Sequence, residues 1–147
     1  MSSYNSLNTF GYVATNHLMR YDSRQARLIA VLDEIIAAAG QVPSTELEQQ
    51  IEDLLGNVLG QTASENIHMF TIDYLAYEDH KLDHFRICTT IAGIRCKAAR
   101  ALCIDDDLQT LRTLLSLHID RHDQMLEQYL VTGVPPYQCQ QYQELCR

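Results

Sequence analysis

The chain has 147 residues, of which 46% are hydrophobic and 20% are charged. This length and balance are typical of one globular domain with a hydrophobic core, and they exclude an intrinsically disordered chain. The 11 Lys and Arg residues stand against 19 Asp and Glu residues, which gives a net charge of −8 and argues against nucleic-acid binding. The longest apolar runs are far too short to span a membrane, so we expect no membrane insertion.

The first predicted helix follows Asp22 and ends at Gly40. Asp22 and Gln25 fit a capping box, and Gly40 with Pro43 is a typical stop signal. Apolar residues recur between them at helical spacing: Leu28, Ile29, Leu32, Ile35 and Ile36. The preceding residues 1–20 are rich in Ser and Asn, and we expect them to form an arm packed on the bundle.

The second predicted helix starts at Ser44 or Thr45 and runs to about Phe70. Glu48 would complete a capping box at its start. Its apolar stripe consists of Leu47, Ile51, Leu54, Leu55, Val58 and Leu59. Two glycines weaken this helix by up to about 1 kcal/mol each, but the stripe keeps its phase through them.

The third predicted helix runs from about Tyr77 to Arg100, and the fourth from Asp105 to Gly133. We expect the third helix to bury Leu82, Phe85, Ile91 and Ile94. The acidic residues from Asp105 to Asp107 suit the positive end of a helix dipole. The fourth helix carries Leu108, Leu111, Leu114, Leu115, Ile119, Leu126 and Leu130.

Four long amphipathic helices with short connections predict an all-α fold, an antiparallel up-down-up-down four-helix bundle. The bundle would occupy residues 21–132, after the N-terminal arm 1–20 and before a short C-terminal tail 133–147. No positive charge precedes Arg20 and no apolar stretch follows Met1, so we expect no signal peptide and a cytoplasmic protein.

The spacing of the histidines is the first indication of a possible metal site. The segment HKLDH places His80 and His84 one helical turn apart, offset by about 40°, so both rings can face one point in the bundle. Imidazoles at this spacing are common metal ligands, although a single such pair is more often a coincidence. The five cysteines form no C-x-x-C motif, which does not support a thiolate zinc site.

The second and fourth helices offer further ligands. His118 lies on the apolar stripe of the fourth helix, and Asp123 follows it by five residues, about 140° away on an ideal helix. His122 competes with Asp123 as the partner of His118. Gln61 and Glu65 lie one turn apart on the second helix, and a buried Glu65 would need a partner such as a metal ion.

Together these motifs resemble the hemerythrin family. Its helices carry a first His, then H-x-x-x-E, then H-x-x-x-H, then H-x-x-x-x-D, and here His80 with His84 and His118 with Asp123 fit the last two. The gap of fifteen residues from Glu65 to His80 is also similar. The resemblance implies metal ligation by His80, His84 and His118, with Glu65 and Asp123 as carboxylate ligands.

Two positions depart from the family pattern. Gln25 stands at the position of the first His, and Gln61 at the His of H-x-x-x-E. In the family, both would serve the second of two irons, the one that binds oxygen. The resemblance therefore implies a modified centre with one or two Fe ions, or Zn, in which Gln25 and Gln61 mark the altered side. His68 is the first alternative ligand for that side.

The resemblance implies that the protein senses, stores or handles O2, NO or iron, with Leu115 lining the small-ligand pocket and no enzymatic activity. Two alternatives stay open. One is a metal-free or zinc-bound degenerate bundle that acts as a protein-interaction module. The other is a ferritin-like di-iron carboxylate enzyme, for which only Glu65 and His68 fit the E-x-x-H motif. Cys88 lies one turn after His84 and is expected to be a packing residue.

Overall fold

A computed structural model describes residues 24–134, and this part of the chain is helical without strands. The first helix occupies residues 24–38. It is followed by α2 (Ser44–Thr71), α3 (Tyr77–Ala99) and α4 (Asp105–His118), then by a π-helical turn, η1 (Ile119–Asp123), and by α5 (Gln124–Thr132). The all-α prediction is confirmed. The predicted arm, almost all of the predicted tail, and the capping residue Asp22 lie outside the described residues.

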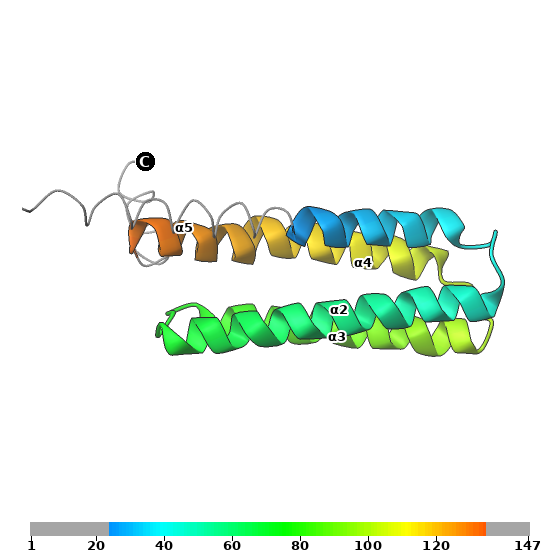
Figure 1. Ribbon diagram of the computed structural model, residues 1–147, viewed down its shortest axis with the longest axis horizontal. Coiled ribbons are helices and arrows are strands. Elements are labelled where there is room, and N and C mark those ends of the chain that lie inside the picture. The colour runs from blue at the N-terminus through cyan, green and yellow to red at the C-terminus, as the bar shows by residue number, and fades with distance from the viewer. Residues whose placement is uncertain (1–23, 135–147) are drawn as a thin grey trace, which may run out of the picture.

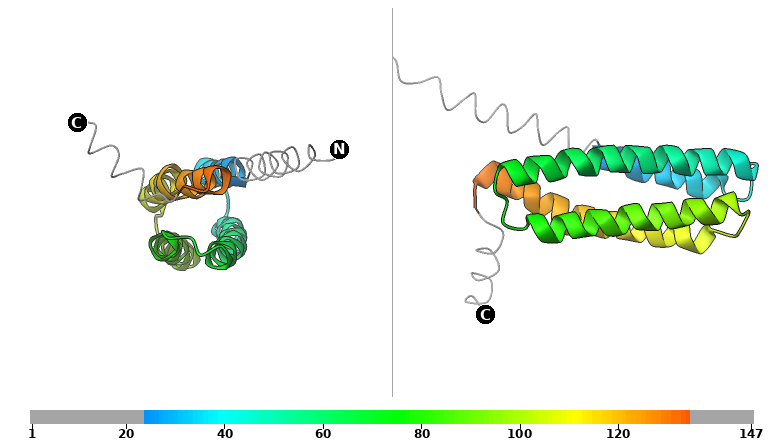
Figure 2. Two further views of the ribbon diagram at one scale, coloured as in Figure 1. Left: turned by 90° about the vertical axis from the view of Figure 1, so that its left-hand side faces the viewer. Right: turned by 90° about the horizontal axis from the view of Figure 1, so that it is seen from below.

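The helices lie side by side as a bundle. In Figure 1, α2 and α3 form one pair of rods, while α4, η1 and α5 continue one another beside the first helix. The end-on view in Figure 2 shows these rods around a common interior. None of the described helices combines the length and the apolar character that a membrane crossing requires.

Two apolar clusters form the core, one on each side of a polar layer. The larger cluster extends along the helices as far as Val58 on α2, Ile87 on α3 and Leu115 on α4. The smaller one begins beyond this layer and consists of Met69, Tyr74, Ala76 and Leu126. Between them lie buried His80, His84, His118 and Asp123, and the half-buried Glu65. Because burying a charge is costly, the groups of this layer need compensation from one another or from a bound ion.

The helix ends follow the sequence closely, with one correction. α2 begins at Ser44 directly after Pro43, but no side chain caps it, so the predicted capping box with Glu48 is wrong. Pro43 fills this role with its backbone carbonyl, which accepts hydrogen bonds from the amides of Glu46 and Leu47. Gly133 ends α5 with a φ of 67°, a conformation that glycine adopts without strain.

The predicted buried face of α3 is partly wrong. Leu82 and Phe85 are 50% and 65% exposed, whereas Ile91 and Ile94 are buried as expected. The inward positions of this helix near the polar layer are those of His80, His84 and Ile87. The side of α3 that carries Leu82 and Phe85 therefore faces away from the core. On α2, Leu59 is likewise 48% exposed.

Candidate metal centre

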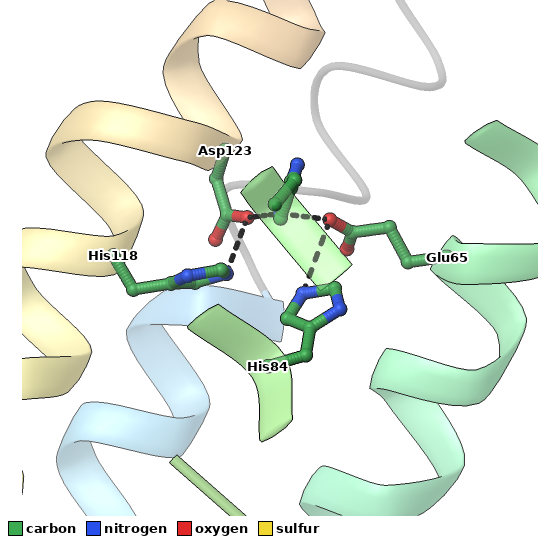
Figure 3. Close-up of side chains that lie close together, drawn as sticks. Glu65, His84, His118 and Asp123 are labelled. Carbon is green, nitrogen blue, oxygen red and sulfur yellow. Dashed lines mark ion pairs between the residues drawn. The ribbon is translucent and has the colours of Figure 1, made fainter. Parts of the chain in front are cut away.

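Five side chains from three parts of the bundle converge in the polar layer. Glu65 comes from α2, His80 and His84 from α3, and His118 and Asp123 from the ends of α4 and η1. One nitrogen or oxygen atom from each lies within 4.8 Å of the other four. Figure 3 shows the labelled members of this group, without a label on His80, facing one another. The structure thus brings together the five predicted imidazole and carboxylate ligands.

The spacing of these atoms matches the coordination shell of one ion. Nitrogen and oxygen ligands lie about 2.0 to 2.2 Å from a zinc ion, so two ligands on opposite sides are roughly 4.4 Å apart. The observed limit of 4.8 Å among all five atoms is close to this value. A buried cluster of His, Glu and Asp side chains that could hold a metal ion is therefore present.

The individual distances show how closely the donor atoms approach. His80 Nε2 lies 2.8 Å from Glu65 Oε1 and 3.2 Å from Asp123 Oδ1. His118 Nε2 lies 3.0 Å from Asp123 Oδ1, and His84 Nε2 lies 3.6 Å from Glu65 Oε1. The four Nε2 and carboxylate contacts join all five residues in one network, which Figure 3 marks in part with dashed lines.

Several of these atoms are buried without a hydrogen bond of good geometry. They are Glu65 Oε1, His80 Nε2 and Asp123 Oδ1, judged within residues 24–134. The atoms approach one another closely but point into a shared space instead of along a donor–acceptor line. A cation in that space would compensate all three atoms at once, which is the usual solution for buried polar groups of this kind.

The π-helical turn explains how His118 and Asp123 reach the same point. On an ideal α-helix, residues five positions apart differ by about 140° in direction. In η1 the backbone amide of Gln124 donates to the carbonyl oxygen of Ile119, five residues earlier. This wider turn brings residues with a spacing of five onto the same side, and such turns are frequent at functional sites.

Two of the histidines are oriented by polar side chains outside the cluster. His118 Nδ1 lies 2.7 Å from Asp83 Oδ2, and His84 Nδ1 lies 2.8 Å from Asn66 Oδ1. Because both partners accept hydrogen bonds through oxygen, each Nδ1 carries the proton and each Nε2 is left with its lone pair toward the cluster. Such outer partners are typical of metal-binding histidines. Sequence reasoning missed both partners.

Burial and the two carboxylates shift the pKa values of the cluster in opposite directions. Burial by itself would lower the pKa of His80, but Asp123 and Glu65 outweigh it and raise this pKa to about 9. Burial, with the neighbouring His80 and His118 charges, lowers the pKa of His84 to about 3. His118 and His80 hold the pKa of Asp123 below its usual value in spite of burial. Without a metal ion, the cluster therefore holds a proton on His80 at neutral pH.

Gln25 and Gln61, the two predicted positions of the altered side, have different surroundings. Gln25 Nε2 donates to Asp123 Oδ2 over 2.6 Å, while Asp123 Oδ1 faces His80 and His118. Gln25 therefore holds the carboxylate oxygen that does not face the cluster. Gln61 is half-buried and lines a cavity of about 190 Å³ beside the cluster.

The other sequence candidates lie around the cluster. His68 is exposed and lines the cavity, and Leu115 is buried and lines it as well. His122 is 24% exposed, and its ring centre lies 5.1 Å from that of His80, but it is outside the group of five. Cys88 is half-buried against Thr62, with 3.9 Å between Sγ and Oγ1, and burial raises its thiol pKa.

Comparisons with known proteins give no independent assignment. No protein-family model, no curated protein and no solved structure matches this chain.

Proposed function

We propose that this protein is a hemerythrin-like, non-haem metal protein that senses, stores or handles O2, NO or iron. The observation that carries the proposal is the convergence of five imidazole and carboxylate atoms within 4.8 Å in a buried layer of the bundle. In this proposal the helices follow the up-down-up-down order, and the metal is held by Glu65, His80, His84, His118 and Asp123.

The donor set favours iron, with zinc as the second choice. Imidazole nitrogen and carboxylate oxygen suit both metals, and no cysteine belongs to the described group. Bound iron would supply electron exchange and a position for a small ligand such as O2 or NO. The residues of this chain would hold the ion and orient His118 and His84 through their Nδ1 atoms, and the apolar clusters would limit the approach of water along the bundle axis.

The contact of Gln25 supports a centre with one ion. A second metal bridged by Asp123 would need the Oδ2 atom, which accepts a hydrogen bond from Gln25 Nε2 over 2.6 Å. We therefore place one metal ion per chain at the cluster.

The second candidate function is a protein-interaction module without metal or with zinc. It is favoured by the exposed apolar side chains near one end of the bundle, which include Ile67, Phe70 and Leu75 with 62% to 69% exposure. Such side chains mark interaction surfaces when they are contiguous. This function would not need the buried polar layer, so we rank it second.

Metal analysis tests the proposal directly. The full chain, purified without chelator and reconstituted with Fe(II) under anaerobic conditions, should contain about one metal ion per chain by mass spectrometry. His118→Ala should lose most of this metal, because it removes a central ligand. Asp120→Ala is the control, because Asp120 is exposed on η1, close in sequence to His118, and lies outside both the group of five and the cavity lining.

The outcomes separate the alternatives. About two ions per chain, with oxygen-dependent absorption, would refute the single-ion centre and favour a dinuclear one. Undiminished metal in His118→Ala would overturn the ligand assignment. A chain that takes up no metal even after reconstitution would leave the interaction module as the better explanation.

A further inference from the structure

The cavity beside the cluster connects the metal centre with the surface. Its volume is about 190 Å³, and Glu65, His84, His118 and Asp123 contribute to its lining. Arg24 and other exposed residues of the first helix and α2 also line it. Within the described residues, the cavity therefore extends from the five-residue cluster to exposed side chains of the first helix and α2.

The size of the cavity exceeds the need of a diatomic ligand. A cavity of about 150 Å³ in a protein core accepts benzene. The cavity of about 190 Å³ beside the cluster consequently has room for a molecule of about six non-hydrogen atoms. A pocket that served only O2 or NO would not need this space.

The lining of the cavity combines aliphatic side chains with the positively charged side chain of Arg24. The aliphatic side chains of the wall are Leu28, Val58, Ile87, Leu115, Ile119 and Leu130. In the metal-bound protein, the charges of Glu65 and Asp123 are balanced by the ion. The Arg24 guanidinium, which is charged at every physiological pH, then sets the sign of the charge available to a ligand.

We propose that this cavity binds a small organic carboxylate of about six non-hydrogen atoms next to the metal ion. The carboxylate lies at Arg24, where a guanidinium forms paired, charge-assisted hydrogen bonds. The short carbon chain lies against Leu28 and Leu115, which removes apolar surface from water. This proposal rests on the proposed metal centre and names the class of ligand that the centre would meet.

Isothermal titration calorimetry of the metal-loaded full chain tests the proposal with butyrate. Butyramide is the matched probe, because it has the same shape and number of non-hydrogen atoms but no charge. We expect butyrate to bind about tenfold or more tightly than butyramide, as a charge-assisted hydrogen bond would give. A longer acid such as octanoate should bind more weakly because it exceeds the cavity.

Variants of the first helix provide the controls. Arg24→Gln should remove the preference for butyrate, whereas Arg27→Gln should keep it, because Arg27 is exposed on the same helix and does not line the cavity. Leu28→Trp should fill the cavity and abolish the binding of both probes while the metal content stays unchanged. Equal affinity for the two probes, or a preference that survives in Arg24→Gln, would overturn the proposal.

Metal content measured on the same samples distinguishes a failure of the proposed metal centre from a failure of the proposed carboxylate site. A chain that contains no metal after reconstitution contradicts the proposed function, whatever it does with butyrate. A chain that carries its metal and binds NO but shows no response to butyrate contradicts only the carboxylate site. The two failures therefore cannot be confused.

Discussion

Asp83 offers the most direct test of whether an outer hydrogen-bond partner positions His118 for metal binding. Its Oδ2 atom lies 2.7 Å from His118 Nδ1, and its side chain is 19% exposed. Asp83→Asn preserves the size of the side chain and an oxygen that can accept the hydrogen bond, but it removes the negative charge. The substitution therefore isolates the contribution of the charge to the binding strength of His118.

The expected loss follows from the position of Asp83. Replacing the outer hydrogen-bond partner of a metal-bound histidine usually weakens metal binding by about 10- to 100-fold. Because Asp83 is partly exposed, water screens its charge, and we expect the lower end of this range, about tenfold or roughly 1.4 kcal/mol. Asp83→Ala, which also removes the hydrogen bond, should weaken binding further.

Competition with a chelator of known affinity measures the effect on the metal-loaded chain. Asp106→Asn is the matched control, because Asp106 is exposed in the first turn of α4 and its loss changes the net charge equally. When the chain is reconstituted with iron, its reduction potential should also shift in Asp83→Asn and stay constant in Asp106→Asn. Equal metal affinity and potential in both variants would refute the positioning role of Asp83.

Three further predictions concern the stability of the chain. In the metal-free protein, the raised pKa of His80 stabilises the fold below pH 6.5 and this contribution, of order 3 kcal/mol, is lost as the pH rises through 9. The lowered pKa of His84 affects stability in the acidic range. Its contribution to the free energy of unfolding is present above pH 6.5 and is lost as the pH falls toward 3. Urea titrations should therefore show a maximum near pH 6.5, and a flat profile would contradict these shifts. Leu54→Ala should cost about 2 to 5 kcal/mol in the free energy of unfolding, whereas Leu82→Ala, at a half-exposed position, should cost much less. Gly40→Ala should cost about 1 kcal/mol by thermal unfolding, because the φ of 79° at this residue strains any side chain.

Helical periodicity in the sequence predicted the helices, whereas the five members of the cluster were predicted only with the added resemblance to the hemerythrin family. The predicted starts at Ser44, Tyr77 and Asp105 agree with those of α2, α3 and α4. Spacings of three and four residues place side chains on one face wherever a helix is regular. His80 and His84 on α3 follow this rule, so their convergence was predictable from the sequence.

The error on α3 shows the limit of counting apolar residues. Leu82 and Phe85 were expected inside, but they lie on the side of α3 away from the core. Near the polar layer the inward positions are occupied by His80 and His84, so the buried face of α3 is polar there. A hydrophobic pattern cannot identify a buried face on which polar side chains occupy the inward positions.

Other features depend on how the helices are rotated relative to one another. Asp83 contacts His118 on α4, and Asn66 on α2 contacts His84 on α3, so these pairs join different helices. The sequence offers only a hint, because Asp83 directly precedes His84, a member of the cluster. The π-helical turn at Ile119–Asp123 was also not predicted, since the sequence was interpreted as one continuous α-helix up to Gly133.

The position of the cluster links metal binding to the stability of the whole bundle. The polar layer separates the apolar cluster around Leu126 from the larger one that ends at Leu115. In the metal-free state, the neighbouring carboxylates raise the pKa values of His80 and His118 in spite of burial, so a metal ion must displace protons held in the cluster. An ion that binds the folded chain and not the unfolded one then stabilises both sides of the bundle. The polar layer interrupts the apolar core and so removes apolar contacts between its two clusters. A bound metal ion would supply stability in place of these contacts.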